Sequence, residues 1–165
     1  MPTSPPPFDK IDTTPPCLFR IDRDGHWFYR GSIIARPAMV KLFASILRRE
    51  GDDYFLVTPV ERERVLVDDA PFTAIALAVE GKADQQILRF TTNIGQEVTA
   101  GTAHPIVMKP GEIHGIKPYI NLGKGMMALI TRSVYLDLAE LAVEEIWHGK
   151  ARYGIWSQGA FFPLD

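Results

Sequence analysis

The sequence predicts an α+β protein with a small β-β-α-β unit and a larger strand-rich unit that ends in one helix. Two amphipathic helical stretches, a series of short strand-like runs after residue 60, and a correspondence between the two helical stretches support this prediction. We expect three parts: a flexible proline-rich arm in residues 1–17, a small domain in residues 18–60, and a larger domain in residues 61–165.

The arm and the first strands come first. Residues 1–16 contain six prolines, which fix φ and remove backbone donors, so an extended arm is expected there. The alternative is a docked strap with Phe8 and Ile11 as its anchors. Next, Asp22-Arg23-Asp24-Gly25 separates two apolar runs, which is typical of a hairpin turn. The same turn lacks the anchoring carboxylates of an EF-hand loop, so calcium is not expected.

The C-terminal helix carries the clearest pattern. After an apolar strand at residues 126–130, Thr131 or Ser133 can cap a helix predicted over residues 132–147, and Gly149 can end it. Its apolar residues recur with helical spacing: Tyr135, Leu138, Ala139, Ala142, Val143 and Ile146. With many short strands before it, this helix is expected to pack across a bent antiparallel sheet.

An earlier stretch resembles this helix. Shifted back by 96 positions, a second helix that starts at Pro37 and ends before Gly51 aligns with it, and Arg36 falls on Arg132. The matching stripe consists of Met39, Leu42, Phe43, Ile46 and Leu47. Either the core is duplicated, or two amphipathic helices align by chance once they are in phase. If the core is duplicated, the seam between its halves is the first place to look for a site.

Composition excludes several classes of protein. The net charge of -2 and pI near 6.1 do not indicate a nucleic-acid polymer or a membrane surface as a partner. The single cysteine, Cys17, cannot form an internal disulfide, and no apolar run has the length of a transmembrane helix. The N-terminus lacks the features of a secretory signal. We therefore expect a soluble, cytoplasmic protein.

The candidate ligand site consists of residues expected at the seam. Arg36 and Arg132 each precede a helix, where a cation opposes the helix dipole, so each needs either a carboxylate partner or a bound anion. The run from Arg89 to Asn93 adds a cation, hydroxyls and an amide at a strand end. A planar ligand could stack on the ring of Trp27, Tyr29 or Trp156. The predicted ligand-binding residues are Arg36, Arg89, Thr92, Asn93, Arg132 and Trp156.

Two further features concern metal and the tail. His104, Glu112 and His114 are the one cluster that could serve a metal or acid–base chemistry, although the first metal motif of cupins is absent. The tail contains three large aromatics, Trp156, Phe161 and Phe162, and we expect it to be docked. We expect no cofactor.

The chain resembles a bacterial family known as domain of unknown function (DUF) 1285. The resemblance lies in IDRDGHWFYRGSIIARPAMVKLFASILRRE, DDYFLVTPVERERVLVDDAPF, LRFTTNIGQEVTAG, ALITRSVYLDLAELAVEE and GIWSQGAFFPL, in this order. It implies a duplicated core, a C-terminal half superficially like pleckstrin-homology (PH) folds, a site for a nucleotide-like ligand between the halves, and a signalling role. It implies no catalytic residues.

The sequence therefore favours a non-catalytic protein that binds a small nucleotide-like anion between its halves or acts in signalling. The alternative is a metal-dependent enzyme that uses His104, Glu112 and His114. A third hypothesis is a protein-interaction domain, for which the proline-rich arm is the one indication. Neither the ligand, nor a protein partner, nor the oligomeric state follows from the sequence.

Overall fold

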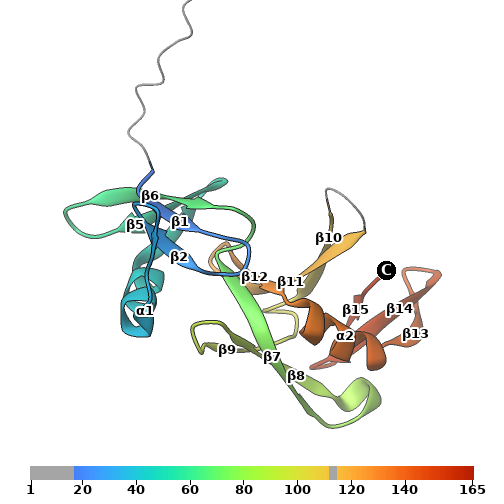
Figure 1. Cartoon of the computed structure of the whole chain (residues 1–165). Helices are drawn as coiled ribbons and strands as arrows, with labels where there is room; N and C mark the ends of the chain where they lie inside the picture. Colours follow the sequence, from blue (N-terminus) through green and yellow to red (C-terminus); the bar gives the residue numbers. More distant parts are fainter. Residues whose placement is uncertain (1–16, 112–114) are drawn as a thin grey trace, which may run out of the picture.

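The computed structural model describes residues 17–111 and 115–165. The described chain is mostly β-strand, with two helices and three sheets. Figure 1 shows the three sheets in sequence order, with helix α1 beneath the first sheet and helix α2 between the second and third. The α+β class is therefore correct, with a larger share of strand than expected.

The first sheet has six strands in the order β3-β2-β1-β6-β5-β4. Two antiparallel meanders are joined by the parallel pair β1–β6, in which Phe19 lies opposite Val65. Because β6 pairs with both β1 and β5, it belongs to this sheet, although it follows the boundary predicted at residue 60. The elements are β1 (Phe19–Ile21), β2 (Trp27–Tyr29), β3 (Ser32–Ile33), α1 (Pro37–Ile46), β4 (Leu47–Glu50), β5 (Asp53–Val57) and β6 (Arg62–Val67).

The second sheet has six strands in the order β10-β11-β12-β7-β8-β9. Here the parallel pair is β7–β12, with Phe72 opposite Ala128. The elements are β7 (Phe72–Glu80), the 3-10 turn η1 (Ala83–Gln85), β8 (Ile87–Thr92), β9 (Glu97–Thr99), β10 (Ile106–Pro110), β11 (Ile116–Gly123) and β12 (Met126–Ile130).

The two large sheets have the same connectivity. In each, the first three strands form one meander, the last three form another, and the first and sixth strands pair in parallel. The helices do not share this correspondence, because α1 joins the third and fourth strands of its sheet whereas α2 follows the sixth. The shared connectivity of the sheets therefore has a different phase from the 96-residue alignment of the helices.

The predicted helix over residues 132–147 is too long. Helix α2 covers Arg132–Glu140, and Val143–Trp147 form strand β13 instead. This strand pairs with β14 (Lys150–Ser157) across a tight turn in which His148 and Gly149 have positive φ, so Gly149 serves a hairpin rather than a helix stop. Ile146, which was expected on the buried stripe, is 75% exposed.

The first helix is shorter than predicted for the same reason. Helix α1 ends at Ile46, and Leu47 begins β4, which pairs with β5 across a turn at Gly51, where φ is +60°. In both places apolar residues were expected to continue the helical stripe: Leu47 in the first helix, and Val143 and Ile146 in the second. Instead, they pair with a downstream strand that the local pattern does not reveal.

The C-terminal tail is part of the folded structure. Strands β13, β14 and β15 (Ala160–Pro163) form the third sheet, and Phe162 and Leu164 are buried. Ser157 of β14 accepts a bond from Leu88 N and donates one to Ala100 O, so the tail is tied to the second sheet.

One large apolar core runs through the described part of the chain, beside a small second cluster of Ala70, Tyr119 and Met127. The large core contains buried residues from all three sheets and from α2, including Ile21, Trp27, Leu56, Leu88, Phe90, Ile120, Leu138 and Ile155. The halves therefore share their interior instead of forming separate cores. Within the described residues, neither helix has the length and apolar content needed to cross a bilayer.

Candidate ligand site

Asn93 connects the two large sheets. It follows β8 in a turn in which Gly95 N donates to Thr92 O and Gly95 has a φ of +84°. The Asn93 side chain accepts from Thr73 N at 3.1 Å and donates to Gly25 O at 3.1 Å. The turn after β8 is thereby fixed to the turn between β1 and β2, at the seam of the molecule.

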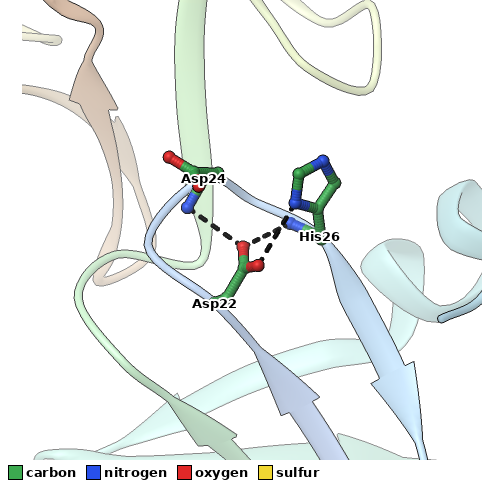
Figure 2. A group of neighbouring side chains, drawn as sticks. All are labelled: Asp22, Asp24 and His26. Carbon is green, nitrogen blue, oxygen red and sulfur yellow. Dashed lines mark hydrogen bonds and ion pairs between the residues drawn. The ribbon is translucent and has the colours of Figure 1, made fainter. Parts of the chain in front are cut away.

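The β1–β2 turn is held by the Asp22 carboxylate. Figure 2 shows its bonds from Asp24 N at 3.0 Å and His26 N at 2.9 Å, and its contact with His26 Nδ1 at 3.2 Å. Burial raises the pKa of Asp22, but the hydrogen bonds from His26 and Asp24 outweigh it, so the pKa lies below its ordinary value.

Asp22, Asp24 and His26 also form a group whose potential metal-ligating atoms lie within 4.8 Å of one another. The hydrogen bonds to Asp22 already account for the arrangement of this group, since they shape the turn that joins two paired strands. The group therefore supports the predicted hairpin turn rather than a cation site.

A cavity of about 300 Å³ lies beside this turn. Most of its lining comes from the first half, and Asn93 and Ile94 come from the second. The lining residues are Asp24, Gly25, His26, Trp27, Ile33, Ile34, Ala35, Pro37, Val40, Lys41, Asn93 and Ile94. We call it the seam cavity, because both halves of the chain contribute to its wall.

The seam cavity includes the start of α1 and a cation. The first turn of α1 has no acidic residue, and its N-cap residue, Arg36, makes no side-chain capping bond, so the positive end of the helix dipole is not neutralised there. Lys41 is exposed and makes no ion pair with another residue of the described chain. Both features favour a negatively charged group near the cavity.

Two buried polar atoms lie beside the seam cavity without a protein partner. Among the described residues, Trp27 Nε1 and Thr73 Oγ1 are buried and make no hydrogen bond. Trp27 lines the cavity and is 1% exposed, and Thr73 Oγ1 lies close to Gly25, which also lines it. Buried donors normally have a partner, so such atoms mark this region as chemically incomplete.

Three of the six predicted ligand-binding residues lie at or next to the seam cavity. Asn93 lines it, and Arg36 stands between Ala35 and Pro37, which both line it. Thr92 precedes Asn93 and is fully buried, and its hydroxyl accepts from Gln96 N within the turn. Thr92 therefore shapes the turn, and it is not among the residues that line the cavity.

The other three predicted residues lie elsewhere. The Arg89 guanidinium forms an ion pair with Glu80 at 2.8 Å within the β7–β8 hairpin. Trp156 lies in β14, where its Nε1 donates to Glu145 at 3.3 Å and its ring packs on Phe161. Arg132 is exposed at the first position of α2, and this helix packs on β7, so the two helix starts do not share one wall of the cavity.

The cluster predicted for metal chemistry is only partly described. His104 is half-buried, and its Nδ1 lies 3.0 Å from Asn121 O. Glu112 and His114 lie outside the described residues. The described part of the chain therefore adds no argument for the metal-dependent enzyme.

The ligand-site prediction omitted Lys41 and gave Trp27 a different role. Lys41 is the one charged residue in the apolar sequence of α1, and it follows Pro37 by about one helical turn. This single charge in an apolar helix could have identified Lys41 as a candidate from the sequence. Trp27 was expected to stack on a ligand, but its burial leaves only its ring nitrogen as an unpaired group.

Taken together, the sheets and the seam cavity define a class: two six-stranded β units of the same connectivity, fused through one core, with a small cavity where they meet. The chain belongs to the DUF1285 family. The model of the DUF1285 N-terminal domain matches residues 7–70, and that of the C-terminal domain matches residues 71–164; both are described as of unknown function.

Solved structures support the same assignment. A DUF1285 family protein from Silicibacter pomeroyi DSS-3 is 47% identical, with a TM-score of 0.82, over 89% of this chain and 79% of that one. Another, from Shewanella baltica OS155, is 32% identical, with a TM-score of 0.58, over 74% of this chain and 91% of that one. The search of the curated proteins found no match.

Proposed function

We propose that the protein is a non-catalytic ligand-binding module that holds a small anionic, nucleotide-like molecule in the seam cavity. The observation that carries this proposal is the combination, around one cavity, of a lysine that has no ion-pair partner among the described residues, an uncapped helix start and a lining tryptophan whose buried ring nitrogen has no acceptor in the described chain. A volume of about 300 Å³ falls at the lower end of the range for small-molecule sites.

Each group has a distinct role in this proposal. Lys41 and the first amides of α1 bind the anionic group, because a helix start and an ammonium both favour negative charge. Ile33, Ile34 and Ile94 provide the apolar wall for a planar group. Asn93 keeps its bonds to Gly25 and Thr73, and so holds the cavity together.

The position of the cavity supports a signalling role. Because both halves contribute to its wall, a ligand that binds there stabilises one arrangement of the halves over others by its difference in affinity. The shared connectivity of the two large sheets supports a duplicated core, with the repeat running from β1–β6 to β7–β12. The bent second sheet followed by α2 is the part of the chain to which the PH-like description applies.

The test is a thermal-shift and calorimetry panel of mono-, di- and cyclic nucleotides on the full chain. We expect at least one of them to raise the melting temperature, and Lys41→Ala to weaken its binding about tenfold or more, as for the loss of a charged hydrogen bond. Binding should also change the fluorescence of Trp27, read in a background in which Trp147 and Trp156 are replaced by phenylalanine.

Arg132→Ala and Arg89→Ala are the matched controls, because both remove an exposed arginine outside the seam cavity. Affinity should be unchanged in both. If no nucleotide stabilises the wild type, the nucleotide-like assignment fails. If Arg132→Ala weakens binding as strongly as Lys41→Ala does, the site is not the seam cavity.

A further inference from the structure

A second and larger cavity lies between α1 and the first sheet. Its volume is about 420 Å³, and its wall is mostly apolar, with Thr58, Glu61 and Glu63 at one side. The apolar lining residues are Leu18, Phe19, Tyr29, Ile34, Met39, Phe43, Ile46 and Leu56. We call it the α1 groove. It shares only Ile34 with the seam cavity.

The apolar surface of α1 is incompletely covered in the described structure. Most of its residues are apolar, yet none of them is buried, and Leu42 is 57% exposed. A helix that is mostly apolar normally buries much of that surface. Some further segment or molecule is therefore needed to complete the packing of α1.

The glutamates beside the α1 groove disfavour an anionic ligand there. Along β6 the side chains alternate, so that Arg62 and Arg64 form ion pairs with Glu50 and Asp53. Glu63 and Glu61 instead line the groove and make no ion pair with the described residues. Two carboxylates at the groove disfavour a fatty acid or another anionic amphiphile.

The described chain begins at the groove. Leu18 lines it, and the Cys17 thiol donates to Arg64 O at 3.1 Å, which fixes the first described residue beside β6. Since β1 runs parallel to β6 with Phe19 opposite Val65, the N-terminal end of β1 points toward the Glu63 and Glu61 end of the groove. The family model of the N-terminal domain also starts at residue 7, so residues 7–16 belong to the matched domain.

The sequence before Cys17 has anchors with suitable spacing. Phe8 follows Pro5-Pro6-Pro7, and Ile11 lies three residues further on. In a polyproline II helix, which has three residues per turn, Phe8 and Ile11 share one face while Asp9, Lys10 and Asp12 lie on the others. Aromatic-lined grooves are the usual acceptors of such segments, and Phe19, Tyr29 and Phe43 supply the rings here.

The segment before Leu18 is also long enough to cover the α1 groove. Phe8 lies ten positions before Leu18, which allows a span of up to about 33 Å. Helix α1 has ten residues and is about 15 Å long. A segment that starts at Leu18 can therefore pass along the whole helix with length to spare.

We propose that residues 5–14 of the same chain form a strap that fills the α1 groove, with Phe8 and Ile11 packed against Phe43 and Met39. The strap completes the cover of α1 and occupies a surface that a proline-rich ligand could otherwise use. This proposal does not depend on the seam cavity.

The test compares full-length variants. In the double variant Phe8→Ala/Ile11→Ala, the methyl resonance of Met39 should shift, the melting temperature should fall by roughly 2–4 °C or more, and an apolar dye should bind more tightly. The matched control, Asp9→Ala/Lys10→Ala, changes the same segment on its other faces and should leave all three readings unchanged.

A cysteine pair supplies the direct evidence. In a Cys17→Ser background, Phe8→Cys with Met39→Cys should form a disulfide within one chain under mild oxidation, whereas Phe8→Cys with Tyr153→Cys should not. A disulfide that joins two chains would assign the groove to a second copy and overturn the proposal. Equal Met39 resonances and equal dye binding in the wild type and the double variant would also overturn it, and would leave the groove to a small apolar ligand.

Discussion

The side-chain amide of Asn93 donates to the carbonyl oxygen of Gly25 at 3.1 Å, across the seam between the two large sheets. Its oxygen at the same time accepts from Thr73 N, so one half-buried side chain joins the turn after β8, the start of β7 and the turn between β1 and β2. Gly25 has a φ of +85°, and a Cβ there would lie 2.6 Å from Asn93 Nδ2, so the contact requires glycine.

Replacing Asn93 should destabilise the fold. Asn93→Ala leaves Thr73 N and Gly25 O without partners, which costs about 1–3 kcal/mol per unsatisfied group. Asn93→Asp keeps the acceptor for Thr73 N but places an oxygen against Gly25 O, so it should also destabilise. Chemical denaturation measures both effects, and a wild-type midpoint in either variant would contradict this role.

Tyr119 should make the protein sensitive to high pH. Its hydroxyl donates to Asp69 Oδ1 at 2.5 Å, and burial, with Asp69 second, raises the pKa of Tyr119 above its ordinary value. A raised pKa means that the fold favours the protonated phenol. Its contribution is therefore complete below about pH 10 and is lost as the pH rises toward the pKa in the folded state.

The comparison with Tyr119→Phe measures this contribution. Urea unfolding between pH 8 and about pH 11 should show a steeper loss of stability in the wild type than in Tyr119→Phe. An absorbance titration of the phenols gives the ionisation directly. Identical pH dependence in the two proteins would show that Asp69 does not hold the Tyr119 proton.

The C-terminal tail should contribute strongly to stability. Phe162 is 8% exposed and belongs to the main core, so Phe162→Ala should cost about 3–5 kcal/mol. Deleting residues 155–165 should lower the melting temperature further, because it also removes the buried Ile155. Tyr153→Ala, in the same sheet but exposed, is the control and should have a small effect.

A metal analysis separates the ligand-binding module from the alternative enzyme. We expect purified protein to contain no stoichiometric zinc, iron or manganese, because the module needs none. Stoichiometric metal that is lost in His114→Ala but kept in His148→Ala would favour the enzyme and would require the role of Glu112 to be tested next.

The family, the α+β class, the β1–β2 hairpin and the starts of both helices followed from local sequence. These features depend on residues close together in the chain: Asp-Gly at the hairpin, Pro37 at the start of α1, and helical spacing from Arg132 to Leu138. Asn93 was predicted as a ligand-binding residue, and the structure places it at the seam, where it bonds to Gly25 and Thr73.

The ends of the helices depended on distant partners. Residues 143–147 keep a helical apolar spacing, yet they pair with residues 150–154, and the backbone hydrogen bonds of that hairpin outweigh a stripe that has no core to face. The same holds for Leu47–Glu50 and β5.

The candidate ligand site was changed by the fold for a related reason. Arg89 and Trp156 carry suitable chemistry, but the pairing of their strands places Glu80 and Glu145 next to them. Lys41 and Trp27 line the same cavity, and α1 packs against β2 through the rings of Phe43 and Trp27. Residue type is local information, whereas the partner of each charge is set by strand pairing and helix packing, which join residues far apart in the chain.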